Sequence, residues 1–230
     1  MSKSTAPLPD WEAVLSAAAR LQSLLPQAVL VGGTASALHA RHRLSRDADH
    51  VLVDLRANFD DILAQLESVA GWKTARVRRP VMILGRLDGI ETGVRQLIRS
   101  EPLETTTISS QGRSITLPTK AEILRIKAAL ILRRNAARDY LDFVALADHM
   151  GDEGATTALT AFDKYYPQDN GQSALQQLLA QLANALPFDL DEMEPGLHEY
   201  KNLDPKWHAW ANVKAAAARL SVALLNCLPP

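Results

Sequence analysis

Two aspartates separated by a single residue stand where an apolar run begins, and this arrangement restricts the local fold more than any other feature. They lie in residues 29–55, which read VLVGGTASALHARHRLSRDADHVLVDL. The apolar runs predict two short strands, at residues 28–31 and 50–55, with a helix over residues 35–42 between them. The glycine pair after the first run predicts a tight turn from strand into helix. This succession of elements favours an α/β arrangement.

The remaining chain divides into two halves of different character near Pro118. Hydrophobic patterning alternates between helical and extended stretches before Pro118, and only helical patterning follows it. Thr119 and Glu122 predict a capping box at the start of the first of these helices. The predicted helices are residues 11–25, 60–69, 119–134, 137–150, 152–165, 171–186 and 206–225, and the predicted strands are residues 73–79, 81–87, 90–97, 105–109 and 114–117. We therefore expect an α+β fold, with an α/β domain in residues 1–117 and a helical domain in residues 118–230.

The composition is that of a folded protein with no overall electrostatic preference. Hydrophobic residues make up 47% of the chain, enough for a core, and the net charge of −1 gives no general attraction to nucleic acids or membranes. Between Lys73 and Arg99, however, seven basic residues stand against two acidic ones. This cluster predicts either a phosphate-binding surface or a solvated strand face, and both interpretations stay open.

The sequence predicts a cytoplasmic protein without membrane contact. Cys227 is the single cysteine, so no internal disulfide can form, which fits a reducing compartment. The first residues, MSKSTAP, lack the apolar core of a signal peptide, and no apolar window reaches transmembrane length.

Asp47 and Asp49 are two residues apart, so they project from the same face of a strand. Two like charges at that separation repel each other unless a cation lies between them. Mg²⁺ takes carboxylate oxygens together with the phosphate oxygens of a substrate, and it is the metal that this pair predicts. The alternative is an ordinary polar strand end, in which Asp47 pairs with Arg46 or Arg43.

Gly32 and Gly33 lie between a predicted strand and a predicted helix. Glycines at such a place let the backbone approach a phosphate, and the amides of the helix N-terminus can then donate to it. Thr34 would cap the helix or bind a phosphate oxygen. The alternative is a tight turn with an ordinary cap. A Walker loop is excluded, because no Gly-Lys-Ser/Thr sequence follows.

The two motifs together resemble the nucleotidyltransferase superfamily that shares the catalytic core of DNA polymerase β. More narrowly, they are similar to its AbiEii toxin family, which carries G-G-T followed by R-x-S-x-D-x-D. The matching residues here are Gly32-Gly33-Thr34 and Arg43-Leu44-Ser45-Arg46-Asp47-Ala48-Asp49. A second matching block follows in residues 119–146, where the family has a helical lysine, then an arginine, then R-D-x-x-D. Its residues here are Lys127, Arg133 or Arg134, Arg138, Asp139 and Asp142.

The resemblance implies a polymerase-β-like core, with a mixed sheet and flanking helices, followed by a helical bundle that completes the active-site cleft. It implies a toxin-like Mg²⁺-dependent enzyme that moves a nucleoside monophosphate from a nucleoside triphosphate to an acceptor. RNA, such as the tRNA acceptor end, is the expected acceptor, and an antitoxin protein is an expected partner.

The resemblance also implies roles for individual residues. Asp47 and Asp49 would hold the metal, and Lys127 would neutralise phosphate charge. Asp139 or Asp142 would position Lys127 or assist the acceptor hydroxyl. The residues expected to bind substrate are Gly32, Gly33, Thr34, Ser45, Arg138 and Asp142. Within the helical block alone, Arg138, Asp139 and Asp142 also fit a purely structural network that joins two helices.

Polymerase-β-like enzymes usually take a third carboxylate from a later strand, and here this chain departs from the pattern. The expected position is Gly93, whereas Glu91 lies two residues earlier and would share its strand face. We therefore expect Glu91 as the third metal ligand, with Arg95 and Gln96 as candidates for binding phosphate or base. If Glu91 cannot serve, the site holds one metal, uses Asp139 or Asp142, or is weak.

Other polar and aromatic residues are interpreted structurally. His50 faces away from the aspartates by strand parity, which predicts a packed or hydrogen-bonded histidine in place of a metal ligand. His39 and His42 lack a further ligand at zinc spacing and are interpreted as surface residues. Trp207 and Trp210 are interpreted as core anchors.

Two alternatives to an RNA-modifying enzyme stay open. A catalytically degenerate module that binds nucleotide or a partner protein is favoured by Gly93 and disfavoured by the intact aspartate pair. A nucleotidyltransferase with a small-molecule acceptor is the other. Dependence of nucleotide binding on Mg²⁺ and release of pyrophosphate would discriminate between the enzymes and the module.

Overall fold

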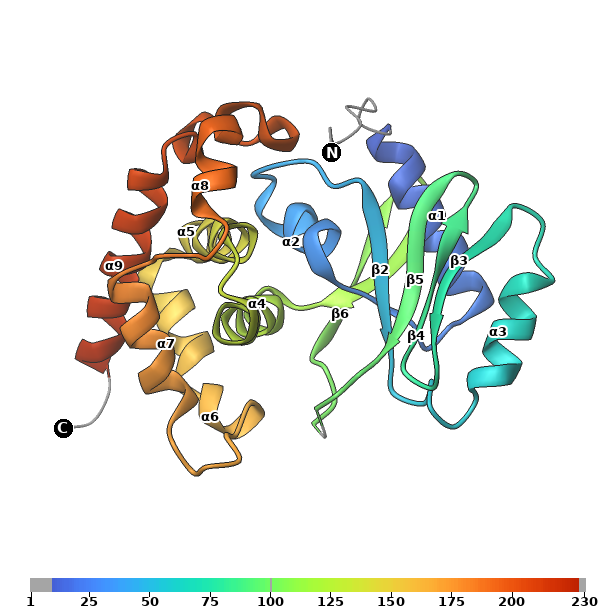
Figure 1. Ribbon diagram of the computed structural model, residues 1–230, viewed down its shortest axis with the longest axis horizontal. Helices are drawn as coiled ribbons and strands as arrows, with labels where there is room; N and C mark the ends of the chain where they lie inside the picture. Colours follow the sequence, from blue (N-terminus) through green and yellow to red (C-terminus); the bar gives the residue numbers. More distant parts are fainter. Residues whose placement is uncertain (1–9, 100, 228–230) are drawn as a thin grey trace. The chain divides into compact units, whose positions relative to one another are not determined.

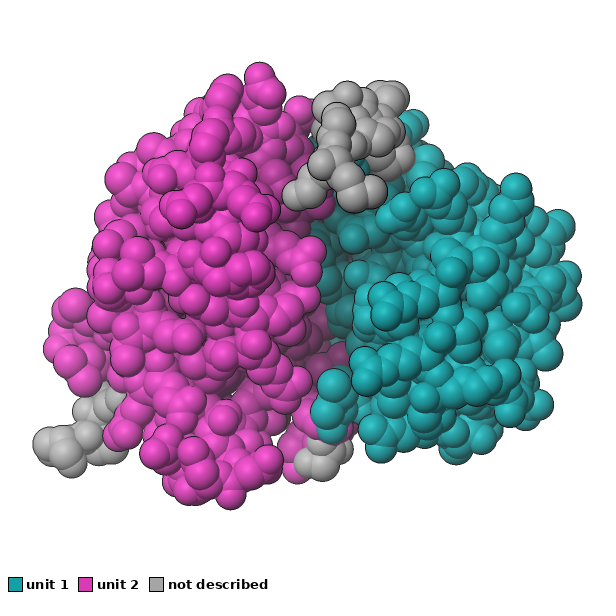
Figure 2. All heavy atoms as spheres, in the orientation of Figure 1, with its two compact units in different colours: residues 1–35, 44–98, 105–117 teal, residues 36–43, 99–104, 118–230 magenta. Residues whose placement is uncertain are grey.

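The computed structural model describes residues 10–99 and 101–227 (Figure 1). The chain forms two compact units, which Figure 2 shows in different colours. Unit 1 contains the residues up to 35 together with residues 44–98 and 105–117. Unit 2 contains residues 36–43, residues 99–104 and the chain from residue 118 onward. Two short segments that precede Pro118 thus pack with the helical part of the chain.

Unit 1 is built on a mixed sheet of five strands with the order β1-β2-β5-β4-β3. Its strands are β1 (Val29–Leu30), β2 (Asp47–Leu52), β3 (Trp72–Arg78), β4 (Met82–Leu87) and β5 (Ile90–Gln96). Strands β2 and β5 run parallel, and the other neighbouring pairs are antiparallel. Strands β6 (Thr105–Ser110) and β7 (Arg113–Pro118) form a separate hairpin.

One face of this sheet carries the core of unit 1. Helices α1 (Trp11–Leu24) and α3 (Phe59–Glu67) bury their apolar sides together with the inward-facing residues of the strands. Leu21 of α1, Leu66 of α3 and Ile83 of β4, all fully buried, belong to this one cluster. Because side chains alternate along a strand, the residues between these core positions must point to the opposite face. That opposite face carries the aspartate pair.

His50 lies on the core face of β2 and is fully buried. Neither ring nitrogen has a hydrogen-bond partner among the described residues. Burial lowers the pKa of His50 to about 4. The interpretation of His50 as a packed histidine is therefore correct.

This shift gives a prediction for stability against pH. A group whose pKa is lower in the folded state stabilises fully above its unfolded pKa, and here that stability is lost as pH falls from about 6.5 towards 4. The loss attributable to His50 is about 3 kcal/mol. Urea unfolding of metal-free protein should show it as a steeper decline in the wild type than in His50→Leu. Parallel declines in the two proteins would contradict the prediction.

Unit 2 is helical. Its main helices are α4 (Lys120–Arg134), α5 (Ala137–Thr160), α7 (Ala174–Ala183) and α9 (Trp210–Cys227), and its shorter ones are α6 (Phe162–Tyr165), α8 (Leu190–Met193) and the 3₁₀ helices η1 (Glu194–Asn202) and η2 (Pro205–Trp207). Helix α5 packs against α4 and α9, and α9 also packs against α7. The predicted α+β class with a C-terminal helical bundle is thus confirmed.

Particular residues explain where these helices begin and how they pack. The hydroxyl of Thr119 accepts a hydrogen bond from the Glu122 amide at 3.2 Å, which caps α4. Only this half of the predicted capping box forms, because the Thr119 amide donates to the Glu104 carbonyl and the Glu122 carboxylate pairs with Arg99 and Arg125. Trp207 and Trp210 are both buried, and the Trp210 ring meets Tyr140 edge-on at 6.0 Å, so both tryptophans anchor the core. Among the described helices none is long and apolar enough to span a membrane.

Candidate active site

The aspartate pair occupies the first and third positions of β2 in unit 1. Asp47 and Asp49 are half-buried, whereas the intervening Ala48 is fully buried, so both carboxylates belong to the face opposite the core. The Ser45 hydroxyl, itself buried, donates to the Asp47 carboxylate with an O–O distance of 2.8 Å. The Thr34 hydroxyl donates to the Asp47 carbonyl. Asp47 is therefore held in place through both its side chain and its backbone.

The glycine turn lies beside the second aspartate. Helix α2 (Gly32–Ala40) begins at Gly32, which has a φ of +72°, a conformation that L side chains rarely adopt. A Cβ added to Gly32 would lie 3.8 Å from both Cβ and Oδ2 of Asp49. The Val31 amide donates to the Asp49 carbonyl at 2.8 Å. The N-terminus of a nine-residue helix and the D-x-D strand therefore meet directly, as expected from the motifs.

Strand β5 places Glu91 and Gly93 next to the aspartates. The parallel register pairs Asp47 with Glu91 and Asp49 with Gly93. Glu91 is exposed, and its Oε1 lies 2.8 Å from Nη2 of Arg86. Among the described residues, no three His, Cys, Asp or Glu side chains converge as a metal-binding group. Glu91 thus shares the face of the pair, and its carboxylate is bound to an arginine.

Gly93 has a packing reason to be glycine. A Cβ at this position would lie 2.4 Å from the Ile83 carbonyl oxygen and 2.9 Å from Cα of Leu84, both on the neighbouring strand β4. Any side chain at position 93 would therefore push β4 away from β5. The absence of a carboxylate at this position follows from the close approach of these two strands.

Restoring the usual carboxylate should accordingly destabilise the fold. We expect Gly93→Asp to lower the free energy of unfolding by about 2–3 kcal/mol, since inserting atoms into a well-packed region forces the backbone to shift. Gly154→Ala is the control, because its new methyl group meets only Met150 Cβ at 3.5 Å within a helix. Urea unfolding measures both variants. A Gly93→Asp protein as stable as the wild type would contradict this explanation.

The second motif of the sequence, in α4 and α5, forms a buried charge cluster within unit 2. Asp142 on α5 is fully buried, and Lys127 Nζ on α4 lies 2.6 Å from its Oδ2. Arg43 adds two bonds, with Nε 2.7 Å from Oδ1 and Nη2 2.9 Å from Oδ2. His42 Nε2 lies 2.8 Å from Oδ1. Because an ionised carboxylate only accepts hydrogen bonds, this nitrogen must carry the proton.

Charge compensation keeps Asp142 ionised. Burial alone would raise its pKa, but the positive charges of Arg43 and Lys127 outweigh burial and hold the pKa of Asp142 well below its usual value. Asp139, one helical turn earlier and also fully buried, lies 3.4 Å from Lys127 Nζ and 3.0 Å from Arg134 Nη2. Lys127 is thus held between two carboxylates.

The cluster corrects the interpretation of His42, which was expected at the surface and is buried against Asp142. Arg43, an alternative partner of Asp47 in the sequence-based interpretation, forms an ion pair with Asp142. Both contacts join residues about one hundred positions apart, so no local sequence pattern can predict them. Arg134 is the arginine that contacts Asp139, whereas Arg138 is exposed on α5.

Five of the seven basic residues between Lys73 and Arg99 lie on the sheet face that carries the aspartates, whereas Arg79 pairs with Asp60 and Arg99 with Glu122. Cross-strand partners point to the same side of a sheet, so the register assigns this face residue by residue. Its basic members are Lys73, Arg76, Arg78, Arg86 and Arg95, all of them exposed. Arg95 lies two positions beyond Gly93 on β5, and its Nη1 is 2.9 Å from Sδ of Met82. We call these five residues the basic face.

Two solved structures share the fold of this chain. The fold resembles that of an antigenic nucleotidyltransferase-like protein from Paracoccidioides brasiliensis, with a TM-score of 0.52 and 20% identity, over 87% of this chain and 98% of that one. It also resembles a nucleotidyltransferase-like protein from H. pylori, with a TM-score of 0.51 and 18% identity, over 96% and 97% of the two chains.

Sequence comparison adds several long relatives and a family. The heme uptake protein MmpL11 of Mycobacterium tuberculosis is 35% identical over 131 residues, which are 56% of this chain and only 13% of that protein. The family model described as "Nucleotidyl transferase AbiEii toxin, Type IV TA system" matches residues 13–216. The chain therefore belongs to the AbiEii family of nucleotidyl transferase enzymes.

Proposed function

We propose that this protein is a Mg²⁺-dependent nucleotidyltransferase that moves a nucleoside monophosphate from a nucleoside triphosphate to an RNA acceptor. One observation carries the proposal. Two carboxylates on one face of β2, Asp47 and Asp49, lie directly beside the glycine-initiated N-terminus of α2. Carboxylates that hold a divalent cation and amides that bind phosphate are the two needs of phosphoryl transfer.

The residues present fit a magnesium ion. Asp47 and Asp49 offer oxygen ligands on one face, and Mg²⁺ is commonly bound by one or two carboxylates together with substrate phosphates. The Ser45 hydroxyl orients Asp47 by its hydrogen bond. When bound there, the ion would supply stabilisation of the negative charge that develops on the transferred phosphoryl group. Glu91 would join as a further ligand only after release from Arg86.

The chain's own residues would bind the triphosphate at the start of α2. The first amides of a helix have no intrahelical acceptor, so those that follow Gly32 are available to phosphate oxygens. Gly32 and Gly33 carry no side chain that would keep a ligand away from the backbone. The Thr34 hydroxyl is committed to the Asp47 carbonyl, which leaves its backbone amide as the phosphate donor.

The basic face supports a polyanionic acceptor. Its five cations share a sheet face with Asp47 and Asp49, so an RNA backbone bound along them would lie next to the reacting groups. This arrangement favours RNA over a small molecule, whose recognition needs few phosphate contacts. We also propose a toxin-like role in the cytoplasm, together with a cognate antitoxin protein, from membership in the family.

Neutralising the outer part of the basic face should weaken RNA binding. We expect Arg76→Gln combined with Arg78→Gln to weaken binding of total tRNA about tenfold at moderate salt. The slope of the logarithm of the binding constant against the logarithm of the salt concentration should become shallower by about 2. Arg56→Gln is the matched control, since Arg56 is exposed in unit 1 but lies in the turn after β2. Fluorescence anisotropy over a salt series measures both. Equal tRNA affinities of the double variant and of Arg56→Gln would contradict the proposal that RNA binds along the basic face.

One specific observation favours a second candidate, a degenerate nucleotide-binding module. The third carboxylate position is Gly93, and the nearest carboxylate, Glu91, is bound to Arg86. The deciding experiment incubates the protein with each α-labelled nucleoside triphosphate, Mg²⁺ and either tRNA or an aminoglycoside. Label on tRNA supports the proposal, and label on the aminoglycoside indicates a small-molecule acceptor. Binding of the triphosphate without transfer to either acceptor indicates the module.

A further inference from the structure

The loop between α2 and β2 is unusually buried for a segment without regular structure. Residues 41–46 form neither helix nor strand, yet His42, Arg43 and Ser45 in this loop are all buried. No ladder of backbone hydrogen bonds holds such a segment, so its shape depends on side-chain contacts. The loop ends at Asp47, the first residue of β2 and the first residue of the aspartate pair.

Asp142 binds two side chains in the first part of this loop, those of His42 and Arg43. Its carboxylate accepts a two-pronged ion pair from Arg43, which fixes the plane of the guanidinium as well as its distance. It also accepts a hydrogen bond from His42 at 2.8 Å. The carbonyl of His42 is bound in turn by the Asp204 amide at 2.7 Å. All these residues lie in unit 2.

The second part of the loop holds Asp47. Only three residues separate Arg43 from Asp47, and the middle one, Ser45, donates to the Asp47 carboxylate. Arg43 is held in unit 2 and Asp47 belongs to unit 1, so the link between them is the chain itself. Holding Arg43 reduces the number of conformations open to the three residues that lead to Asp47, and one of these, Ser45, binds the Asp47 carboxylate.

We propose that Asp142 is a positioning residue for nucleotidyl transfer, which acts through His42 and Arg43 to hold the loop that presents Asp47. The inference rests on the proposed function, because positioning matters only if Asp47 takes part in transfer. Asp142 on this account touches neither triphosphate nor acceptor. Its three basic partners already occupy both of its oxygens.

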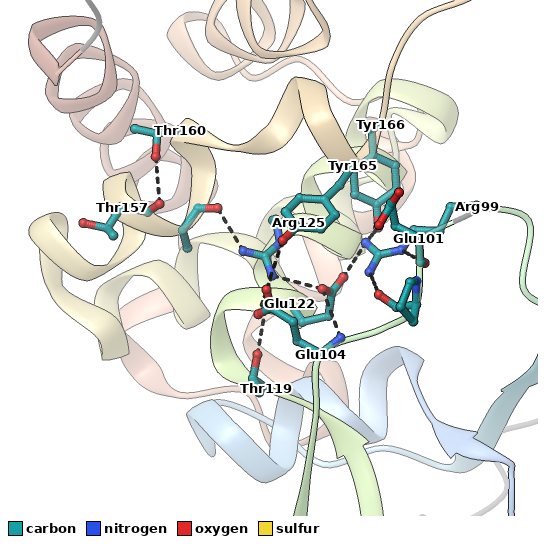
Figure 3. A network of polar contacts seen from close by, with 12 residues as sticks. Arg99, Glu101, Glu104, Thr119, Glu122, Arg125, Thr157, Thr160, Tyr165 and Tyr166 are labelled. Atoms are coloured by element: carbon teal, nitrogen blue, oxygen red, sulfur yellow. Dashed lines mark hydrogen bonds and ion pairs between the residues drawn. The ribbon is translucent and has the colours of Figure 1, made fainter.

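Unit 2 provides a matched control in a second buried ion network. Glu122 is fully buried between Arg99 and Arg125, and Arg125 also meets Glu104, as Figure 3 shows. Glu122→Gln removes one buried carboxylate charge from two arginines, just as Asp142→Asn does from Arg43 and Lys127. The ion pairs of Glu122 are with Arg99 and Arg125, neither of which belongs to loop 41–46, so the two variants share the loss of a buried charge but not the partners in the loop.

The first test is hydrogen exchange of the unliganded protein, which needs no activity. In Asp142→Asn and in Arg43→Gln, amides in a peptide covering residues 41–47 should exchange about tenfold faster or more, because the loop opens locally. Glu122→Gln should leave this peptide at the wild-type rate. Unchanged exchange in Asp142→Asn, or equal acceleration in Glu122→Gln, would overturn the proposal.

The second test separates positioning from substrate contact. Asp142→Asn should lower kcat about tenfold or more while the KM for the triphosphate changes less than about threefold. The double variant Arg43→Gln/Asp142→Asn should transfer as slowly as the slower single variant, because both changes release the same loop. If the two effects multiply, Asp142 acts independently of Arg43 and the inference is wrong.

Failure of the proposed function would look different. If the wild type transfers no nucleotide, the enzyme proposal fails, and the exchange measurement still decides whether Asp142 holds the loop. If the wild type transfers and Asp142→Asn transfers equally well, only the positioning inference fails.

Discussion

Asp49→Asn should abolish nucleotidyl transfer almost completely while the protein stays folded. The amide has the shape of the carboxylate but no charge, so it cannot balance a divalent cation beside Gly32. A bound metal contributes several kcal/mol of charge stabilisation in the transition state, and each 1.4 kcal/mol is a factor of ten. We therefore expect a loss of about a thousandfold in kcat/KM, measured by transfer of label from an α-labelled triphosphate.

The control for this variant removes a carboxylate from the turn that follows β2. Asp54 follows β2 and accepts a hydrogen bond from Asn58 at 2.9 Å, remote in sequence from the glycine turn. Asp54→Asn should transfer nucleotide at a rate within about threefold of the wild type. The change weakens only an exposed hydrogen bond to Asn58, which contributes little to stability. Wild-type transfer by Asp49→Asn would show that the aspartate pair is not the metal site.

Lys127→Met should cause a large loss of stability. Lys127 is buried between Asp139 and Asp142, and removing it leaves two buried carboxylates with less compensation. Breaking a buried ion pair by removing one partner costs about 3–5 kcal/mol. We expect a decrease of about 3 kcal/mol in the free energy of unfolding, since Arg43 and Arg134 remain as partners.

A neighbouring arginine tests whether burial of Lys127 explains the loss of stability in Lys127→Met. Arg134 also contacts Asp139, but its side chain is 39% exposed. Arg134→Met should therefore cost less than about 1 kcal/mol, as is usual for ion pairs that water screens. Urea denaturation followed by circular dichroism gives both values. Similar costs for Lys127→Met and Arg134→Met would contradict the account of the cluster.

Local patterns predicted much of unit 1. The glycine turn and the D-x-D strand are close in sequence, and their contact follows from a short strand–helix–strand connection. The boundaries were less accurate, because α2 begins at Gly32 and β2 at Asp47, each three residues earlier than predicted. A helix can start on glycine when tertiary contacts position it, and propensity does not anticipate this.

The sequence did not reveal contacts that depend on distant segments. His42 appeared to be a surface residue because its partner, Asp142, lies on another helix one hundred positions away. The glycine at position 93 appeared to be a lost carboxylate, and the reason lies in the approach of β4. Segments 36–43 and 99–104 pack in unit 2 for the same reason, since their contacts are with later helices. The short helices α8 and η1 were also missed, because their acidic, proline-containing segment lacks a periodic apolar face.

The most direct measurement compares pyrophosphate release with label incorporation for the wild-type protein, supplied with a nucleoside triphosphate, tRNA and Mg²⁺. The account predicts equal amounts of pyrophosphate and of labelled tRNA for at least one of the triphosphates, and neither product when EDTA removes the metal. Absence of both products with every triphosphate, from protein shown to be folded, would contradict the central claim that Asp47 and Asp49 form a nucleotidyl transfer site.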